Sequence, residues 1–435
     1  MSLLIQTGNV ASALAGEYEI ANSVRFENDG DSDSFSRSMV AGTSRRKFTI
    51  SMWVKKTKNV PGGEQVLFHS WQDSNNRLQI GFQSDNTLQI RNRASGSDNV
   101  NYTTTQRFRD VSAWYHLVFQ FDTTHANTDF RVRMYVNGSQ ITVFDTSTAP
   151  SVNTDMSIGT TDFTNIIGIY GGGGNGFSGY MAEVVYLDGL DHAASFFGEF
   201  DEDTNVWKPK EIDDFTFGNN GFYLDFENSS SLGADVSGEG HNFTVNNLTS
   251  TDQTTDTCTN NFATLNPVDN AQAVAFSLAD GNLELNDNGS ADNDMGLRAT
   301  MGVLSGKWYY EQKQHETSGT VGLVGSDVRL VFDLENQTTA FHRLVGSNGS
   351  GSSIVYWSNG TFVNDSTLQG WAAGDIIGVA LDMDNGKLFF SINGVFKGFD
   401  NNSSDPANGT NANFTNIPTD GTGGFAMPYI GKRGT

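Results

Sequence analysis

The stretch that decides the fold is Arg131-Val-Arg-Met-Tyr-Val-Asn-Gly-Ser-Gln-Ile-Thr-Val-Phe144, an alternating segment on each side of an Asn-Gly pair. Asn-Gly supplies the two positive φ angles that a type I′ turn requires, so this stretch predicts a tight β-hairpin. A second stretch has the same design, Lys387-Leu-Phe-Phe-Ser-Ile-Asn-Gly-Val-Phe-Lys-Gly-Phe399. The two lie far apart in dissimilar surroundings. We therefore expect each hairpin to mark a separate β-sandwich domain.

The composition agrees with a turn-rich β protein of two or three domains. The chain has 435 residues, of which 48 are Gly and only 17% are charged. The net charge of −24 repels nucleic acid and anionic lipid, so we expect neither as a partner. Cys258 is the single cysteine, which excludes an intramolecular disulfide and predicts folding in a reducing cytosol.

The sequence predicts neither secretion nor membrane insertion. The first residues, Met-Ser-Leu-Leu-Ile-Gln-Thr-Gly, lack the basic and continuous apolar regions of a secretory signal. No apolar run approaches the roughly 20 residues that span a bilayer.

Short alternating segments indicate strands in both halves of the chain. Residues 48–55, Phe-Thr-Ile-Ser-Met-Trp-Val-Lys, have period two, which predicts one buried face and one partly exposed face. Residues 191–200 are the best helical candidate. We predict an all-β protein of two antiparallel jelly-roll sandwiches. The expected divisions are a lead-in or attachment segment over 1–20, a first sandwich over 21–200, an Asn-, Thr- and Asp-rich connector over 201–265 and a second sandwich over 266–435.

The first sandwich resembles a laminin-G-like domain of the concanavalin A type. The resemblance covers about residues 24–188 and rests on four segments: Phe48-Thr-Ile-Ser-Met-Trp-Val, Trp114-Tyr-His-Leu-Val-Phe-Gln-Phe-Asp, Arg133-Met-Tyr-Val-Asn-Gly and Phe177-Ser-Gly-Tyr-Met-Ala-Glu-Val. The order and spacing of these segments match that family.

The second sandwich resembles a SPRY (B30.2-like) domain. The segments that carry this resemblance are Gly306-Lys-Trp-Tyr-Tyr-Glu, Val321-Gly-Leu-Val and Gly374-Asp-Ile-Ile-Gly-Val-Ala-Leu-Asp with the hairpin that follows. The chain departs from the family after Ala426-Met-Pro-Tyr-Ile-Gly, where SPRY domains usually continue. This puts the last strand of the second sandwich in doubt.

The connector, with Phe222-Tyr-Leu-Asp-Phe-Glu-Asn and Asn260-Asn-Phe-Ala-Thr-Leu-Asn-Pro267, resembles one found between such domains in virion proteins of tailed phages, especially marine ones. That resemblance implies a virion protein made in the host bacterial cytoplasm and displayed on the virion exterior. It further implies other virion proteins as partners and a homo-oligomer, with a trimer favoured.

Two catalytic patterns fail on inspection. Residues 171–176, Gly-Gly-Gly-Gly-Asn-Gly, satisfy a dinucleotide-binding pattern formally but lead into a strand-like segment rather than a helix. Residues 199–204 are Glu-Phe-Asp-Glu-Asp-Thr, where jelly-roll glycan hydrolases would need a second Glu at position 204. We therefore expect no enzyme activity and no catalytic residue.

One loop offers a candidate calcium site. Asp29, Asp31 and Asp33 alternate as carboxylates do in calcium loops, although the later positions of an EF-hand are not matched. Laminin-G-like domains often bind calcium, so the resemblance makes Ca²⁺ the one cofactor to consider.

Aromatic residues in polar loops are the better lead to a ligand, because sugars are commonly held by an aromatic face together with amide and carboxylate hydrogen bonds. Trp71 lies in such a loop, and Trp357 lies beside a turn. The alternative for both is shielding of a sandwich edge. The candidate ligand-binding residues are Trp71, Gln72, Asp73, Asn75, Asn76, Tyr170, Asn175, Tyr356 and Trp357.

The sequence thus favours a non-enzymatic virion protein, a tail fibre or surface appendage, that adheres to a glycan or protein of the host surface. Two alternatives stay open. One is a capsid or tail decoration that binds mainly other virion proteins, and the other is a jelly-roll glycan hydrolase.

Overall fold

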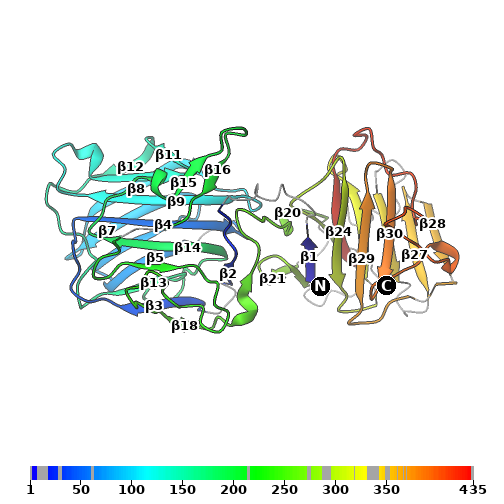
Figure 1. Ribbon diagram of the computed structural model, residues 1–435, viewed down its shortest axis with the longest axis horizontal. Coiled ribbons are helices and arrows are strands. Elements are labelled where there is room, and N and C mark those ends of the chain that lie inside the picture. The colour runs from blue at the N-terminus through cyan, green and yellow to red at the C-terminus, as the bar shows by residue number, and fades with distance from the viewer. Residues whose placement is uncertain are drawn as a thin grey trace. The chain divides into compact units, whose positions relative to one another are not determined.

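A computed structural model of the chain is almost entirely β-structure, which confirms the all-β class. It divides into two compact units, an N-terminal unit of Ala11–Asn261 and a C-terminal unit of Phe262–Thr435 with Met1–Val10 (Figure 1). The structure describes residues 2–6, 18–27, 32–59, 63–212, 216–271, 276–286, 295–317, 319–330, 342–347, 353–359, 361–365, 367–368 and 370–432.

The N-terminal unit contains two antiparallel sheets, here called sheets I and II. Sheet I has the order β11 (Ser139–Ile141), β10 (Val132–Val136), β9 (Trp114–Asp122), β4 (Lys47–Lys56), β14 (Gly179–Asp188), β2 (Ser23–Phe26), β19 (Gln253–Thr254), and β17 (Phe222–Leu224) also pairs with β14. Sheet II has the order β12 (Phe144–Thr148), β8 (Ser97–Arg107), β7 (Thr87–Ala94), β6 (Asn76–Phe82), β5 (Gln65–Asp73), β13 (Thr164–Ile167), β3 (Ser34–Ser38), β18 (Thr244–Asn246).

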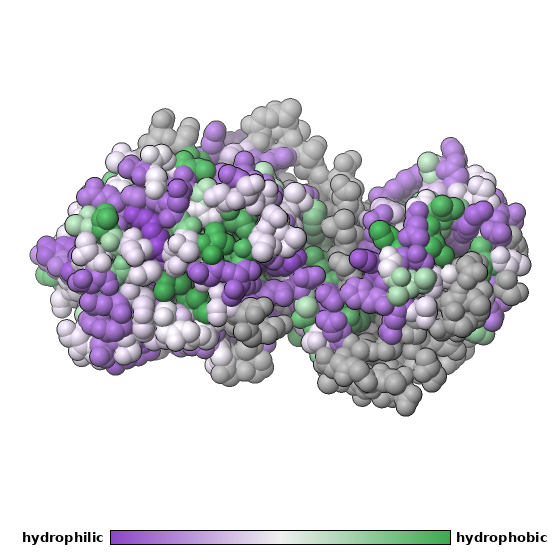
Figure 2. Space-filling model, turned by 90° about the horizontal axis from the view of Figure 1, so that it is seen from below, coloured by the Kyte–Doolittle hydropathy of each residue, from purple (hydrophilic) through white to green (hydrophobic). Residues whose placement is uncertain are grey.

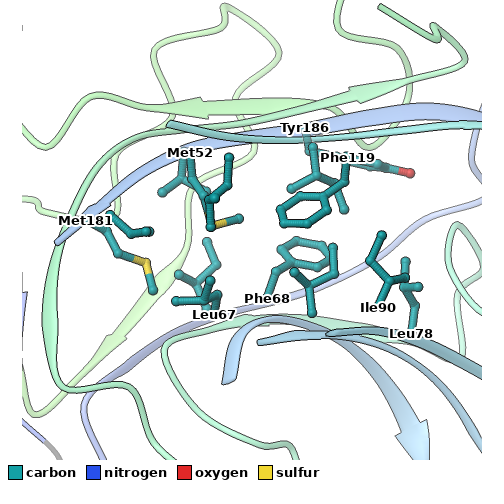
Figure 3. Packing of buried hydrophobic residues seen from close by; sticks show 14 of the residues in the cluster. Met52, Leu67, Phe68, Leu78, Ile90, Phe119, Met181 and Tyr186 are labelled. Carbon is teal, nitrogen blue, oxygen red and sulfur yellow. The ribbon is translucent and has the colours of Figure 1, made fainter. Parts of the chain in front are cut away.

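The core of this unit lies between the two sheets and follows from the period of two along each strand. Figure 3 shows Met52 and Phe119 from sheet I facing Leu67 and Phe68 from sheet II. All four side chains are fully buried. This packing fixes which residues of each strand point away from the core, and therefore which residues are free to form a site.

The outer face of sheet I is also buried, contrary to the partly exposed face that the sequence predicts for residues 48–55. Trp53 stacks on His116 with ring centroids 4.6 Å apart, and His116 stacks in turn on Trp207 at 5.9 Å. Trp207 belongs to the two-stranded sheet of β15 (Gly198–Phe200) and β16 (Trp207–Pro209). Part of the expected connector therefore covers sheet I.

A buried ion pair fastens another connector segment to the same face. The Nζ of Lys55 is fully buried and donates to the Asp256 carboxylate at 2.9 Å and to Oδ1 of Asn261 at 2.8 Å. The Trp114 Nε1–H donates to the other Asp256 oxygen at 3.1 Å. Burial lowers the pKa of Lys55, and the Asp256 charge opposes that shift.

Both Asn-Gly hairpins are confirmed. Asn137 and Gly138 have φ angles of 45° and 76° between β10 and β11. In the C-terminal unit, Asn393 and Gly394 have φ angles of 50° and 79° between β30 (Lys387–Ile392) and β31 (Val395–Phe396).

The helix predicted over residues 191–200 is wrong. The structure has there only a 3₁₀ turn, η2 (Ala194–Phe196), followed directly by β15. Pairing of β15 with β16 supplies the backbone hydrogen bonds that a short helix would otherwise provide. The other 3₁₀ turns of the described residues are η1 (Thr128–Phe130), η3 (Ser250–Asp252) and, in the C-terminal unit, η5 (Phe399–Asn401).

The C-terminal unit likewise contains two antiparallel sheets, III and IV. Sheet III has the order β21 (Ser277–Ala279), β22 (Glu284–Asn286), β1 (Ser2–Gln6), β24 (Lys307–Lys313), β29 (Ile376–Asp382), β30, β31. Sheet IV has the order β20 (Leu265–Ala271), β23 (Met295–Ala299), β32 (Ala426–Lys432), β25 (Gly319–Gly325), β26 (His342–Ser347), β27 (Ile354–Ser358), β28 (Thr361–Asp365).

The two ends of the chain contribute strands to this unit. The sequence left the last strand of the second sandwich in doubt. The structure forms it: β32, residues 426–432, lies between β23 and β25 inside sheet IV. β1, which falls in the expected lead-in segment, pairs antiparallel with β24 from Ser2 opposite Lys313 to Gln6 opposite Tyr309.

The surface is largely polar. On the face seen in Figure 2, hydrophobic residues form small groups between hydrophilic ones. Among the described residues, the structure contains no helix of the length and apolarity needed to cross a membrane.

One acidic side chain is buried in sheet I. Glu183 lies at the irregularity in the pairing of β14 with β4, where its φ is +47°. The carboxylate is 3% exposed and accepts hydrogen bonds from the hydroxyls of Tyr223, at 2.8 Å, and Tyr18. Burial raises the pKa of Glu183 to about 7, although the two hydroxyls oppose that shift.

This burial predicts a pH-dependent stability. The folded pKa of Glu183, about 7, exceeds the unfolded value of 4.5. The stabilisation it gives is therefore complete below about pH 4.5 and lost as the pH rises through 7. We expect Glu183→Gln to gain stability relative to the unmodified protein by roughly 3 kcal/mol between pH 4.5 and 8. Urea unfolding across this range measures the difference.

Glu202→Gln serves as the matched control, because Glu202 is exposed on the same unit. It should show a pH-independent difference. A Glu183→Gln difference that stays flat with pH would mean that Glu183 is already ionised in the folded protein.

Candidate functional site

Two of the aromatic residues predicted from the sequence meet on the outer face of sheet II. Trp71 is at the end of β5 and Tyr170 follows β13, the neighbouring strand. Their rings pack edge to face with centroids 5.1 Å apart, and both side chains are half-buried. Because β5 and β13 are adjacent, residues a hundred positions apart form one aromatic surface.

His69 completes this aromatic group. It is two residues before Trp71, so both side chains lie on the same face of β5. Its ring stacks on Tyr170 at 4.8 Å and lies 5.1 Å from Trp71. We call His69, Trp71 and Tyr170 the aromatic cluster.

The imidazole of His69 is neutral and has a defined tautomer. Burial, together with the nearby Arg77 charge, lowers the pKa of His69 to about 3. The Nδ1 atom accepts the backbone N–H of Gly171 at 2.8 Å, so in the neutral ring the proton is on Nε2. Among the described residues, this buried Nε2–H has no hydrogen-bond partner.

Arg77 adds a cation to the aromatic cluster. It lies opposite Trp71 in the pairing of β5 with β6, and its guanidinium carbon is 5.8 Å from the centre of the Tyr170 ring. Nη1 donates to the backbone oxygen of Ser74, whereas the buried Nε has no partner among the described residues. The side chain thus keeps hydrogen-bonding capacity beside an aromatic face.

The glycine-rich loop, residues 171–176, closes over the aromatic cluster. A Cβ on Gly171 would lie 2.3 Å from Cγ of Trp71, so only glycine allows the backbone to contact the indole this closely. The loop continues through Phe177 into β14 and not into a helix, which removes the context that a dinucleotide site requires. Asn175 is exposed in this loop, and its backbone oxygen accepts the N–H of Val66 at 3.0 Å.

The predicted polar residues near Trp71 form the turn between β5 and β6. The Asp73 carboxylate accepts the backbone N–H groups of Asn75 at 2.7 Å and Asn76 at 2.9 Å, and these hydrogen bonds lower its pKa. Oδ1 of Asn76 accepts the N–H of Ser95 and joins this turn to the next one. Asp73 and Asn76 therefore hold the turn, whereas Gln72 and Asn75 are exposed beside the aromatic cluster.

Half-buried polar side chains continue from the aromatic cluster across sheet II. Gln89 donates to Asn101 at 3.0 Å and to Thr103 at 3.1 Å, and Arg91 pairs with Asp98 at 2.7 Å. Amide, hydroxyl and guanidinium groups held in this way present ordered donors and acceptors with little loss of rotamer entropy on binding.

The two candidates of the C-terminal unit do not belong to this surface. Trp357 is 2% exposed and packs in the core beside Tyr429, so its expected role as a ligand contact is corrected to a core role. The turn at Asn359 suggested a surface position, but the indole belongs to a buried hydrophobic cluster with Val324 and Leu344. Tyr356 is half-buried and stacks on Phe399 with centroids 3.7 Å apart.

The predicted calcium loop lies partly outside the described residues. Asp29 and Asp31 lie outside the described residues, and the Asp33 carboxylate accepts the backbone N–H of Glu27 at 2.7 Å. The described residues contain no group of three His, Cys, Asp or Glu side chains placed to hold a metal ion.

Residues 199–204, the segment compared above with glycan hydrolases, form the end of β15 and the turn after it. Oδ1 of Asp201 accepts from the backbone and the hydroxyl of Thr204, and Lys208 lies near both Asp201 and Glu199. These contacts show that the carboxylates of Asp201 and Glu199 stabilise the turn and its pairing with β16.

Sequence reasoning named Trp71 and Tyr170 but missed His69 and Arg77. The signal for His69 was its position two residues before Trp71 on one strand. Arg77 becomes visible only once the pairing of β5 with β6 is known. Together the four residues offer an aromatic face, two donors and an adjacent polar strip, which is an arrangement suited to reversible binding of a polar ligand with apolar patches.

Comparison with known families agrees with both resemblances. Residues 29–190 match the Laminin_G_3 family model, described as the concanavalin A-like lectin/glucanases superfamily, and residues 307–403 match the SPRY domain. The chain therefore contains one domain of each kind. No curated protein matches the chain significantly.

Some solved structures align with the chain at low sequence identity. Domains LG4-5 of the mouse laminin alpha1 chain share 9% identity over 97% of this chain and 84% of theirs, with a TM-score of 0.30. A putative carbohydrate binding protein from Bacteroides ovatus shares 16% sequence identity over 55% of this chain and 60% of its own, with a TM-score of 0.38. The SPRY domain of human HERC1 shares 18% sequence identity over 39% of this chain and 91% of its own, with a TM-score of 0.28. At these identities and TM-scores, the solved structures assign neither a fold nor a function to this chain.

We expect Gly171→Ala to displace the Trp71 indole, because the new Cβ would lie 2.3 Å from Cγ. Overpacking of this kind costs about 2 kcal/mol. The indole N–H resonance of Trp71, assigned with Trp71→Phe, should shift.

Gly173→Ala is the matched control. A Cβ there meets nothing within 4 Å, so only the positive φ of 87° opposes the change. It should leave the indole resonance in place. An unchanged resonance in Gly171→Ala would mean that the glycine loop does not position Trp71.

Proposed function

We propose that this chain is a non-enzymatic adhesion protein whose N-terminal unit binds a glycan at the aromatic cluster. The observation that carries the proposal is the meeting of Trp71 and Tyr170, 5.1 Å apart, beside Arg77 on a polar sheet face. Aromatic rings pack on the apolar faces of sugars, and guanidinium and amide groups bind sugar hydroxyls.

The burial pattern of the N-terminal unit supports this location. The outer face of sheet I is filled by Trp53, His116 and Trp207, which leaves no open face for a ligand there among the described residues. On sheet II, by contrast, Gln89, Arg91 and their neighbours stay half-buried. A ligand that lies along sheet II would reach both the aromatic cluster and these polar groups.

We propose in addition that the chain acts on the exterior of a tailed-phage particle. This rests only on the sequence resemblance of residues 222–267 to the connector of such virion proteins. In that setting the partners are other virion proteins and a host surface glycan. A homo-oligomer, with a trimer favoured, would combine several weak sites and gain avidity without further contacts.

The test is binding of the labelled full chain to a glycan array and then to bacterial cells. Trp71→Ala should weaken binding to the best glycan about tenfold, because it removes the indole from the aromatic cluster. Binding to susceptible cells should be saturable and should fall in parallel. Repeating the assay with EDTA tests calcium.

Phe200→Ala is the control, because Phe200 is an exposed aromatic of the same unit outside the aromatic cluster. It should bind as the unmodified chain does. Equal loss in both variants, or no binding of glycan or cells by folded protein, would overturn the proposal and favour a decoration that binds virion proteins.

A further inference from the structure

The C-terminal unit contains a cavity that the glycan proposal does not use. It lies between sheets III and IV, has a volume of about 320 Å³, and is lined by residues of β26, β27, β29, β30 and β31 and of the segments that follow β28 and β31. Protein interiors are close-packed, and an engineered cavity of about 150 Å³ already binds benzene. The cavity is therefore large enough for a ligand of about two rings.

Its walls are mainly apolar. Val345 and Ile354 come from sheet IV, Ile377 and Phe390 come from sheet III, and Leu368 lies on the segment between the sheets. Water is poorly held in an apolar cavity, because it needs two to four polar partners. The walls thus select an apolar body.

Two polar side chains of the lining are fully engaged by the protein. Oδ1 of Asn413 accepts the N–H of Phe390 at 2.8 Å, and its Nδ2 donates to the backbone oxygen of Lys397 at 3.0 Å. The Asp375 carboxylate accepts from the N–H of Ala372 at 2.7 Å and from Nδ2 of Asn393 at 2.8 Å. The protein therefore holds both side chains in place, and Asp375 brings a negative charge to the lining.

Three polar groups of the lining have no hydrogen-bond partner among the described residues, and one of them is the buried hydroxyl of Ser391. Trp371 is 1% exposed, and its buried Nε1–H has no partner among the described residues. The Lys397 ammonium is half-buried and makes no hydrogen bond or ion pair with the described residues. The indole and the ammonium can only donate, and the Ser391 hydroxyl can donate as well, so an acceptor on the ligand suits all three groups, and the lysine charge favours an anionic one.

We propose that this cavity binds a small organic carboxylate with an apolar, two-ring-sized body. The body occupies the space between Ile377, Phe390 and Val345, and the carboxylate pairs with Lys397 and accepts from Trp371. Lys397 and Asp375 are the two charged side chains of the lining, and of these only Asp375 is held by hydrogen bonds within the described residues, so Lys397 is the group that can pair with an anion.

The experiment is calorimetric titration of the full chain with 2-naphthoate and with 2-naphthamide, its neutral analogue. We expect one site per chain and tighter binding of the carboxylate. Lys397→Met should weaken 2-naphthoate about tenfold and remove the preference over the amide, whereas Trp371→Phe should weaken both ligands.

Matched controls come from the same unit. Trp308→Phe also removes an indole N–H, but this one donates to the Ser305 backbone oxygen outside the cavity lining. Lys313→Met removes an exposed lysine of β24. Neither should change binding. Val345→Phe places a ring in the cavity and should abolish binding.

No saturable binding by the folded chain, or equal binding in Val345→Phe, would overturn the proposal. Equal affinity for acid and amide in the unmodified chain would overturn the anion requirement. If Val345→Phe or Trp371→Phe does not fold, as seen by thermal unfolding, the Lys397→Met comparison still decides the outcome.

Discussion

Burial of both faces of sheet I is the constraint on which the N-terminal unit depends. In β4, every residue after Lys47 is buried, although half of its side chains point away from the inter-sheet core. Polar groups on that second face must be paired, and the Lys55–Asp256 ion pair and the His116 stack between Trp53 and Trp207 meet this need. The cover is made by segments of the chain that follow β14, which pack on the outer face of sheet I.

The aromatic cluster is then a consequence of strand order. Trp71 and Tyr170 approach because β13 pairs with β5, and Gly171 lets the loop pass against the indole. His69 is held neutral by burial and keeps a proton on Nε2, so it stacks on Tyr170 without bringing a charge into the site. The Arg77 guanidinium beside it is the cationic element of the surface. Under the proposed glycan-binding function, weak polar contacts of this kind would gain strength from repeated copies of the site.

Turns and strand alternation were predictable from the sequence. Which distant segments pack over a given strand face was not. The Asn137-Gly138 turn follows from two residues, and the alternation of residues 48–55 follows from their own pattern. Whether Ser51 and Lys55 face water depends on where residues 198–209 and 256–261 pack, which no local period reveals. The same limit explains Trp357, whose turn looked exposed although its indole belongs to a buried cluster with residues of β25, β26 and β32. Trp71 and Tyr170 could be named singly, but their contact required the pairing of β5 with β13.

Hydrogen–deuterium exchange of the full chain, with and without a saturating amount of its best-bound glycan, tests the account most directly. The account predicts slower exchange at residues 69–77 and 168–176, because a ligand on the aromatic cluster covers the turn after β5 and the glycine loop. Exchange at residues 198–209, which cover sheet I, should not change. Protection confined to the C-terminal unit, or to the segments over sheet I, would contradict the assignment of glycan binding to sheet II.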